Sequence, residues 1–243
     1  MRKLFSLIVL CAAVSSASAQ NIQQLIDQKA KALLPKVIEW RRHLHQNPEL
    51  GNREFKTMEY IANHLRSLGL EVKTGVAKTG VVALLKGGKP GPVVALRADI
   101  DGLPIKERVD VPYKSTVMAD YLGQQVPVMH ACGHDAHTAM LLGAAKVLAE
   151  NRDKLAGTVI LIFQPAEEGG ADVDNFTQGT EIGSRKMITD GALKNPKPEV
   201  IFGMHVMAGM PSGNILYKDG AILNSADHLR IQVNGKQVHG SMP

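Results

Sequence analysis

The strongest constraint on the fold is a series of short apolar runs separated by segments with helical character. The runs at residues 93–97, 158–163 and 200–204 have the length of strands, and the first two are typical of strands buried on both faces. Helices are expected at residues 22–46, 53–68, 136–150 and 181–193. Strands that alternate with helices predict an α/β domain with a largely parallel sheet.

Further local signals complete this picture. Strands are expected at residues 71–76 and 80–85, and the Lys-Gly-Gly-Lys-Pro-Gly-Pro cluster at 86–92 predicts a turn. Residues 227–234 differ from the rest, since apolar residues alternate there at Leu229, Ile231 and Val233. This alternation predicts a half-exposed strand of a second, small domain.

The N-terminus has the pattern of a secretory signal. Arg2 and Lys3 precede an apolar run at residues 4–14, and small residues at 17–19 offer a cleavage site before Gln20. A membrane anchor is the alternative, but a bilayer crossing needs roughly 20 apolar residues. We expect residues 1–19 to be a signal peptide and the mature protein to be periplasmic or secreted, with no stable membrane association.

Cysteine and charge content narrow the class of protein. Of the two cysteines, only Cys132 remains after signal removal, so no internal disulfide is possible. Its thiol is either buried and inert, intermolecular, or a ligand or nucleophile. The 28 basic and 23 acidic residues form no block of like charge, and aromatic residues make up 4% of the chain, which argues against a nucleic-acid partner.

Four polar stretches follow the ends of expected strands, where open α/β sheets bind ligands. In the stretch at 130–137, Cys132 and His134 stand two residues apart, close enough to reach one metal ion or two neighbouring ones. A core cysteine beside helix-capping residues is the alternative, disfavoured by three histidines and an aspartate within eight residues. The other stretches lie at 97–104, 163–170 and 203–206.

Two of these stretches add carboxylates and an imidazole. Glu167 and Glu168 are adjacent after a strand, and in an extended segment their side chains would point opposite ways. One would then bind a metal ion while the other acts as a general base on water. A solvated acidic loop is the alternative. His205 is either a ligand or structural, and Asp99 and Asp101 either ligate or support the ligands.

Together these stretches resemble the metal-dependent amidohydrolases that include hippurate hydrolase, N-acyl-L-amino-acid amidohydrolase and the plant auxin-conjugate hydrolases. The family belongs to one peptidase superfamily with aminoacylase and glutamate carboxypeptidase. The resemblance runs from about residue 22 to the last residue. Its motifs are RRHLHQNPELGNREF (41–55), LRADIDGLPI (96–105), MHACGHDAHTAMLLGAA (129–145), FQPAEEGG (163–170) and GMHV (203–206).

The resemblance implies a role for each matching residue. Glu167 matches the general base, Asp101 a residue that supports the metal centre, and His239 a lid histidine that stabilises the oxyanion. The matching metal ligands are Cys132, His134, Glu168 and His205. The resemblance implies two divalent metal ions; this donor set suits zinc, with manganese, cobalt or nickel as alternatives. His43 and His45 are expected to be structural, His64 and His228 to lie on the surface, and His130 and His137 to pack near the site.

The implied architecture is a metallopeptidase catalytic domain at residues 20–224, followed at 225–243 by the start of a small α+β lid, or dimerisation, domain. Family members continue beyond this point and supply a further histidine ligand, so a truncated chain is expected. The implied reaction is hydrolysis of the amide bond of an N-acyl amino acid or similar small conjugate, in a protein that forms a homodimer through its lid. The alternatives are an inactive fragment with residual metal binding and a dipeptidase of the same superfamily.

Overall fold

The computed structural model describes residues 2–170, 180–223, 231 and 234–242. Its elements are α1 (Arg2–Gln46), α2 (Phe55–Ser67), β1 (Glu71–Val76), β2 (Gly80–Lys86), β3 (Lys89–Asp99), β4 (Met118–Tyr121), β5 (Gln124–Pro127), α3 (His134–Ala149), a short 3₁₀ helix (Arg152–Lys154), β6 (Ala156–Gln164), α4 (Gly183–Thr189) and β7 (Val200–Gly203). The helices and strands predicted up to residue 204 are therefore present, most with ends shifted by a few residues. The exception is α1, which begins at Arg2 rather than at residue 22.

The central sheet has the strand order β1-β2-β6-β3-β7. β6, β3 and β7 pair in parallel, whereas β2 is antiparallel to both of its neighbours. Of the five strands that the described residues form in this sheet, four thus run in one direction, which confirms the predicted α/β class. The parallel register places Asp99 beside Gln164 and Arg97 beside Gly203, so β3, β6 and β7 end at the same edge.

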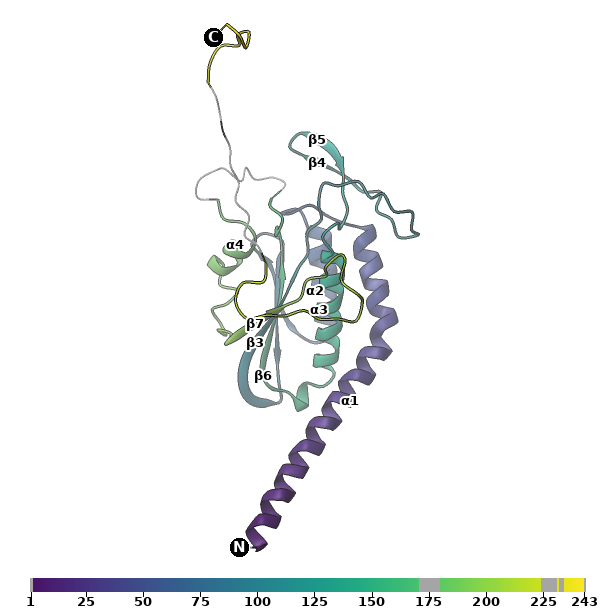
Figure 1. Ribbon diagram of the computed structural model, residues 1–243, viewed down its shortest axis with the longest axis vertical. Coiled ribbons are helices and arrows are strands. Elements are labelled where there is room, and N and C mark those ends of the chain that lie inside the picture. The colour runs from purple at the N-terminus through teal and green to yellow at the C-terminus, as the bar shows by residue number, and fades with distance from the viewer. Residues whose placement is uncertain (1, 171–179, 224–230, 232–233, 243) are drawn as a thin grey trace.

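Alternating side chains of the sheet bury two separate apolar layers. The odd-numbered positions of β2 and β6, such as Val81 and Phe163, pack against α1, α2 and α3. The even-numbered positions, such as Val82 and Ile162, pack on the other face with Met187 of α4. The domain therefore has three layers, with three helices on one face and α4 on the other (Figure 1).

The helices owe their positions to apolar residues spaced three or four apart. Trp40 and Leu44 of α1 and Ile61 and Leu65 of α2 are all buried in the larger layer. α1 ends two residues before Pro48, as the sequence predicts. It begins at Arg2 and so includes most of residues 1–19, whose cleavage as a signal peptide stays a prediction.

One predicted turn is partly wrong. β3 begins at Lys89, inside the Gly-Pro cluster at residues 86–92. The strand tolerates this composition because its register against β6 shifts between Lys89 and Val93, where prolines need not supply ladder hydrogen bonds. Gly91 also lies against the β6 backbone, since a Cβ there would lie 2.7 Å from the carbonyl carbon of Ala156.

The sequence analysis also missed the antiparallel hairpin β4–β5. Leu122 and Gly123 connect the two strands with φ values of 54° and 78°. Two successive positive φ values are typical of the type I′ hairpin turn, which usually carries Asn-Gly rather than Leu-Gly. The hairpin protrudes at the end of the domain where β3 ends (Figure 1).

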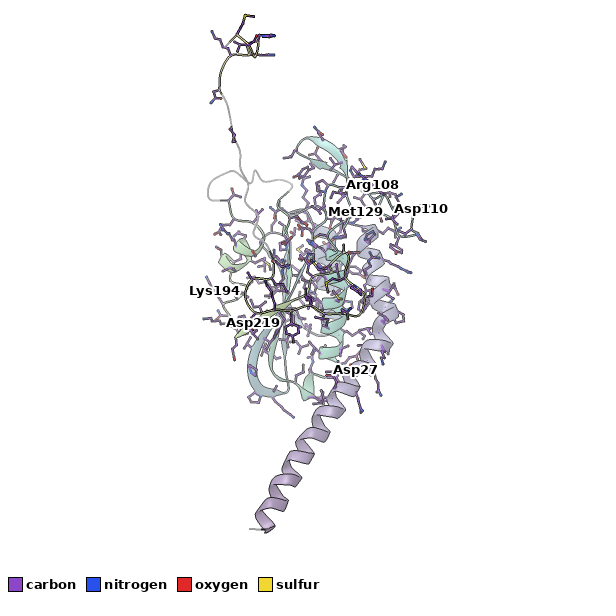
Figure 2. The ribbon with its side chains drawn as sticks, in the orientation of Figure 1. Asp27, Arg108, Asp110, Met129, Lys194 and Asp219 are labelled. Atoms are coloured by element: carbon purple, nitrogen blue, oxygen red, sulfur yellow. The ribbon has the colours of Figure 1, made fainter. Side chains whose placement is uncertain are left out.

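Charged side chains of both signs are spread over the described surface. Asp27 lies on α1, Arg108 and Asp110 lie on the long loop before β4, and Lys194 and Asp219 lie on another flank (Figure 2). Within the described part of the chain, no helix combines the length and the apolar character needed to cross a membrane. The strand predicted at 227–234 falls largely outside the described residues.

Candidate metal centre

The Cys-Gly-His motif forms the entry to α3. Gly133 precedes the helix with φ 90°, a left-handed conformation that favours glycine. A Cβ on Gly133 would lie 2.2 Å from Cγ2 of Val206, so only glycine allows the segment after β7 to pack this closely. The motif and the 203–206 segment are thereby brought together.

His134 is the central residue of the site. Its ring is fully buried, and its Nδ1 lies 3.0 Å from Oδ1 of Asp101. Nε2 has no hydrogen-bond partner among the described residues; it lies 3.7 Å from Oδ2 of Asp99 and 3.9 Å from Oε2 of Glu167. Donation of the Nδ1 proton to Asp101 leaves the Nε2 lone pair free to bind a metal ion.

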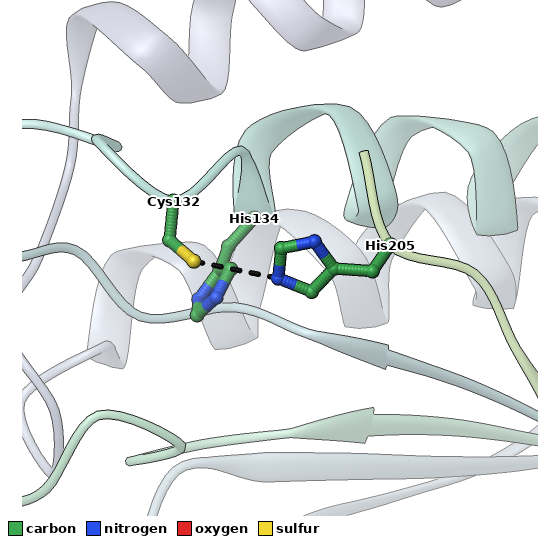
Figure 3. Close-up of side chains that lie close together, drawn as sticks. All are labelled: Cys132, His134 and His205. Carbon is green, nitrogen blue, oxygen red and sulfur yellow. Dashed lines mark hydrogen bonds between the residues drawn. The ribbon is translucent and has the colours of Figure 1, made fainter. Parts of the chain in front are cut away.

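Cys132 and His205 face each other beside His134. Sγ of Cys132 lies 3.4 Å from Nε2 of His205, which is 73 residues further along the chain (Figure 3). The Nδ1 of His205 lies 2.7 Å from the carbonyl oxygen of Val206 and can donate to it. This contact also leaves Nε2 as the free nitrogen, so a thiol and two imidazole nitrogens converge.

The carboxylate pair sits in a bend directly after β6, where Ala166 has φ 48°. The expectation that Glu167 and Glu168 point opposite ways in an extended segment is therefore wrong. Each offers an oxygen within 4.8 Å of the other and of a His134 nitrogen, so both face the same centre. The backbone N–H of Glu168 donates to Oδ2 of Asp101 at 2.9 Å, which ties the bend to the same aspartate that orients His134.

The residues fit a divalent metal ion. Three donor groups share His134: Cys132 with His205, Asp99 with His137, and Glu167 with Glu168. The free Nε2 of His134 is a buried lone pair that a cation would satisfy. Sulfur, imidazole and carboxylate ligands together suit zinc and related transition metals. All four sequence-predicted ligands are thus brought to one place.

Burial and negative charge dominate the electrostatics of the site. Burial, the contact with Glu168 and the charges of Glu167 and Asp99 raise the pKa of the Cys132 thiol to about 12. Burial likewise raises the pKa of Glu167, and the Asp101 and Asp99 charges add to this effect while His134 opposes it. A bound cation would offset this excess of negative charge and hold Cys132 as the thiolate.

His137 supports the centre without an assigned chemical role, as the sequence predicts. Its Nδ1 donates to Oδ1 of Asp99 at 2.6 Å, and its Nε2 accepts the N–H of Val206 at 2.9 Å. Although burial alone would raise the pKa of Asp99, its contacts with His137, His134 and Arg97 hold it at about 2. His137 therefore links the end of β3 to the loop that carries His205.

A second buried network braces the start of α3, and its partners were missed from the sequence. His45 of α1 lies between two carboxylates, with Nδ1 2.8 Å from Asp135 and Nε2 3.0 Å from Glu107. The Asp135 contact raises the pKa of His45, although burial opposes it. Nε of Arg41 lies 2.7 Å from the same Asp135 oxygen. The RRHLH motif was the only available signal, and it carried no assignable chemistry.

Other sequence-predicted histidines have mixed outcomes. His43 stacks on Tyr60, which agrees with a structural role, and His130 is buried near the site. His64, expected on the surface, is half-buried, and its ring packs edge-on against Trp40 at a centroid distance of 4.4 Å. α2 turns this side chain toward α1, a contact that helical spacing alone does not reveal.

His239 is not brought to the centre. It is exposed, and its Nδ1 lies 2.8 Å from Oγ of Ser241 within its own turn. Figure 1 shows the C-terminal residues 234–242 extending away from the sheet. The predicted role of His239 therefore stays a prediction, and His228 lies outside the described residues.

Comparison with known proteins identifies the family of the chain. The model of peptidase family M20/M25/M40 matches residues 95–239. The IAA-amino acid hydrolase ILR1-like 2 of Arabidopsis thaliana is 41% identical over 98% of this chain and 51% of that protein. The N-acetyl-L-cysteine deacetylase of Bacillus subtilis is 41% identical over 84% of this chain and 42% of that protein.

A solved structure supports the same relationship. The YXEP protein of Bacillus subtilis, described as a dinuclear metal binding peptidase from the M20 family, superposes with a TM-score of 0.63. It is 41% identical and covers 75% of this chain and 46% of its own length. The chain spans about half the length of the curated relatives it matches. From the match over residues 95–239 and these similarities, the chain belongs to peptidase family M20/M25/M40.

Proposed function

We propose that the protein is a metal-dependent amidohydrolase that cleaves the amide bond of N-acyl amino acids or similar small conjugates. The observation that carries this proposal is the convergence of Cys132, His205, Glu167 and Glu168 on His134, whose Nε2 has no hydrogen-bond partner among the described residues. The relatives named as an IAA-amino acid hydrolase and an N-acetyl-L-cysteine deacetylase support this substrate class, since both names describe an acyl group joined to an amino acid.

Four residues would hold the metal: Cys132, His134, Glu168 and His205. Asp101 would orient two of them, because it contacts the His134 ring and the Glu168 backbone N–H. Two divalent ions, most simply zinc with manganese, cobalt or nickel as alternatives, would supply Lewis-acid polarisation of the amide carbonyl and activation of water. The dinuclear relative supports the number of ions.

Glu167 would act as the general base. Its side chain is 39% exposed and lies 3.9 Å from His134 Nε2, so it borders the centre while remaining accessible to water. Burial raises its pKa, which brings its basicity closer to that suited to proton transfer near neutral pH. Glu167 would take a proton from the attacking water and return it to the leaving amine.

The proposal extends to features outside the described site. The residue pattern at 1–19 supports a signal peptide and a periplasmic or secreted location. The VHGSMP sequence supports His239 as an oxyanion-stabilising residue of a lid through which the protein would form a homodimer.

Hydrolysis of hippurate tests the proposal directly. Protein stripped with a chelator and reloaded with Zn²⁺ or Co²⁺ should release benzoate, and metal-free protein should not. Glu167→Ala should abolish turnover while its metal content, measured by mass spectrometry, stays unchanged. A folded, metal-loaded protein without turnover on hippurate or N-acetyl amino acids would contradict the proposed activity, whereas unchanged turnover in Glu167→Ala would contradict the assignment of the base. Preferential cleavage of dipeptides would favour a dipeptidase.

A further inference from the structure

A buried glutamate lies directly behind the carboxylate pair. Glu54 precedes α2, and its residue is 0% exposed. Its Oε1 accepts the backbone N–H of Ala166 at 2.8 Å, and its Oε2 accepts the hydroxyl of Thr79 at 2.5 Å. Ala166 immediately precedes Glu167 and Glu168, so Glu54 binds the backbone of the residue next to the proposed base.

The backbone at this point needs support from its surroundings. Ala166 has φ 48°, and a non-glycine residue in the left-handed region costs about 1–3 kcal/mol. The peptide that Glu54 holds is therefore the one whose conformation sets the direction of the following two side chains. The hydrogen bond satisfies a buried N–H that would otherwise be costly in this bend.

Two glycines confine the same bend. A Cβ on Gly51 would lie 1.9 Å from the carbonyl oxygen of Gly169 and 3.1 Å from Cα of Ala166. A Cβ on Gly183 would lie 2.7 Å from the carbonyl oxygen of Ala166. The backbone of the bend therefore packs closely against the backbone at Gly51 and at Gly183. Glu54 adds a side-chain hydrogen bond to the Ala166 N–H of this bend.

We propose that Glu54 is a positioning residue that holds the Ala166 amide and so directs Glu167 and Glu168 toward His134. This inference rests on the proposed function for the role of Glu167, but its effect on metal binding through Glu168 is independent of turnover. Burial raises the pKa of Glu54 to about 7, so part of the Glu54 population is neutral at neutral pH. A glutamine can accept from Ala166 with its carbonyl and donate to the Thr79 hydroxyl with its amide.

Three variants at position 54 separate the effect of the Glu54 hydrogen bonds from the effect of its acidity. Glu54→Gln keeps the hydrogen bond from Ala166 and replaces the one from Thr79 by a bond in the opposite direction, so it should bind and turn over like the unmodified protein, within about threefold. Glu54→Ala removes both, and Glu54→Asp withdraws the carboxyl group by one methylene while keeping it acidic. Supporting partners of metal ligands typically change metal affinity or activity by about 10–100-fold, and we expect losses in this range for both.

Glu49 offers a matched control in the same segment. Its carboxylate accepts the N–H groups of Lys56 and Thr57 at 3.2 and 2.8 Å and the Thr57 hydroxyl at 2.9 Å. These bonds hold the start of α2 rather than the bend that carries the carboxylates. Glu49→Ala should therefore lower the urea midpoint of unfolding while leaving the metal site unchanged.

Each variant is measured for Zn²⁺ affinity by competition with a chromophoric chelator, for its Co²⁺ absorption spectrum, for kcat and KM with hippurate, and for its urea midpoint. Glu54→Ala and Glu54→Asp should weaken Zn²⁺ binding, alter the Co²⁺ spectrum and lower kcat more than they raise KM. Unchanged Zn²⁺ affinity and Co²⁺ spectrum in both would overturn the proposal. An equal loss of Zn²⁺ affinity in Glu49→Ala, at a matched urea midpoint, would also overturn the proposal. A loss of Zn²⁺ affinity above tenfold in Glu54→Gln would overturn it as well, and this measurement decides the case if Glu54→Ala and Glu54→Asp do not fold. If the unmodified protein binds Zn²⁺ but hydrolyses no hippurate, the proposed function fails, while the Zn²⁺ and Co²⁺ measurements still judge the role of Glu54.

Discussion

Replacement of Glu54 by glutamine should change how the stability of the protein depends on pH. Glu54 is buried between α2 and the bend after β6, and burial is the largest cause of its raised pKa. The hydrogen bonds from Thr79 and Ala166 oppose this effect, and the charge of Asp101 adds to it. Glutamine keeps the size and the hydrogen bond from Ala166 and can donate to the Thr79 hydroxyl, but it cannot ionise.

The magnitude follows from the two pKa values. The pKa of Glu54 is about 7 in the folded protein, against an ordinary value of 4.5. At about 1.4 kcal/mol per pH unit, this difference corresponds to roughly 3 kcal/mol. Because the folded pKa is raised, the folded state binds the proton more tightly. The stabilisation is therefore fully present below pH 4.5 and is lost as the pH rises to about 7.

Urea unfolding of metal-free protein between pH 4 and pH 8 measures this effect. The two proteins should have similar free energies of unfolding near pH 4, and Glu54→Gln should gain roughly 3 kcal/mol relative to the unmodified protein by pH 8. All other titrating groups are shared, so the difference between the two curves isolates Glu54. A difference that stays flat across this range would refute the reasoning, because Glu54 would then ionise as readily in the folded protein as in the unfolded chain.

Three further substitutions address the metal centre. Glu167→Gln should lower kcat for hippurate by about 10²–10⁴-fold with unchanged zinc content, and a smaller loss measured at saturating substrate would argue against general-base catalysis. Cys132→Ser should weaken Zn²⁺ binding, measured by chelator competition, because a hydroxyl is a poorer ligand than a thiolate; equal affinity would exclude sulfur ligation. Gly133→Ala should destabilise the protein by about 1–3 kcal/mol in urea unfolding, since its Cβ would meet Val206. Val206→Ala added to Gly133→Ala should restore only part of this loss, because φ 90° remains unfavourable for alanine; full restoration would show that the contact alone is responsible.

Much of this arrangement follows from the sequence because it depends on short-range patterns. Apolar runs of strand length predicted β3, β6 and β7, and the rule that parallel strands end at a common edge predicted that their polar stretches would meet. Cys132, His134, Glu168 and His205 therefore lie together as expected. Predicting the parallel strands and the metal ligands at their ends therefore required no long-range information beyond the direction of the strands.

The errors arise where distant residues decide a local conformation. The left-handed Ala166 bends the chain after β6 because Glu54 and Gly51 contact it from more than 100 residues away, and no local signal in the FQPAEEGG stretch indicates this. His64 is similar, since its contact with Trp40 depends on how α1 and α2 pack. The Leu122–Gly123 hairpin was missed because its turn lacks the usual asparagine.

The position of His205 after β7 has a consequence for the lifetime of a bound metal ion. β7 pairs in parallel with β3, and His205 follows it, whereas Cys132 lies at the entry to α3. A cation held jointly by Cys132 and His205 would link these two segments, so separating them would require the loss of one ligand. The rate at which the ion leaves would therefore follow the local separation of the segment after β7 from the start of α3.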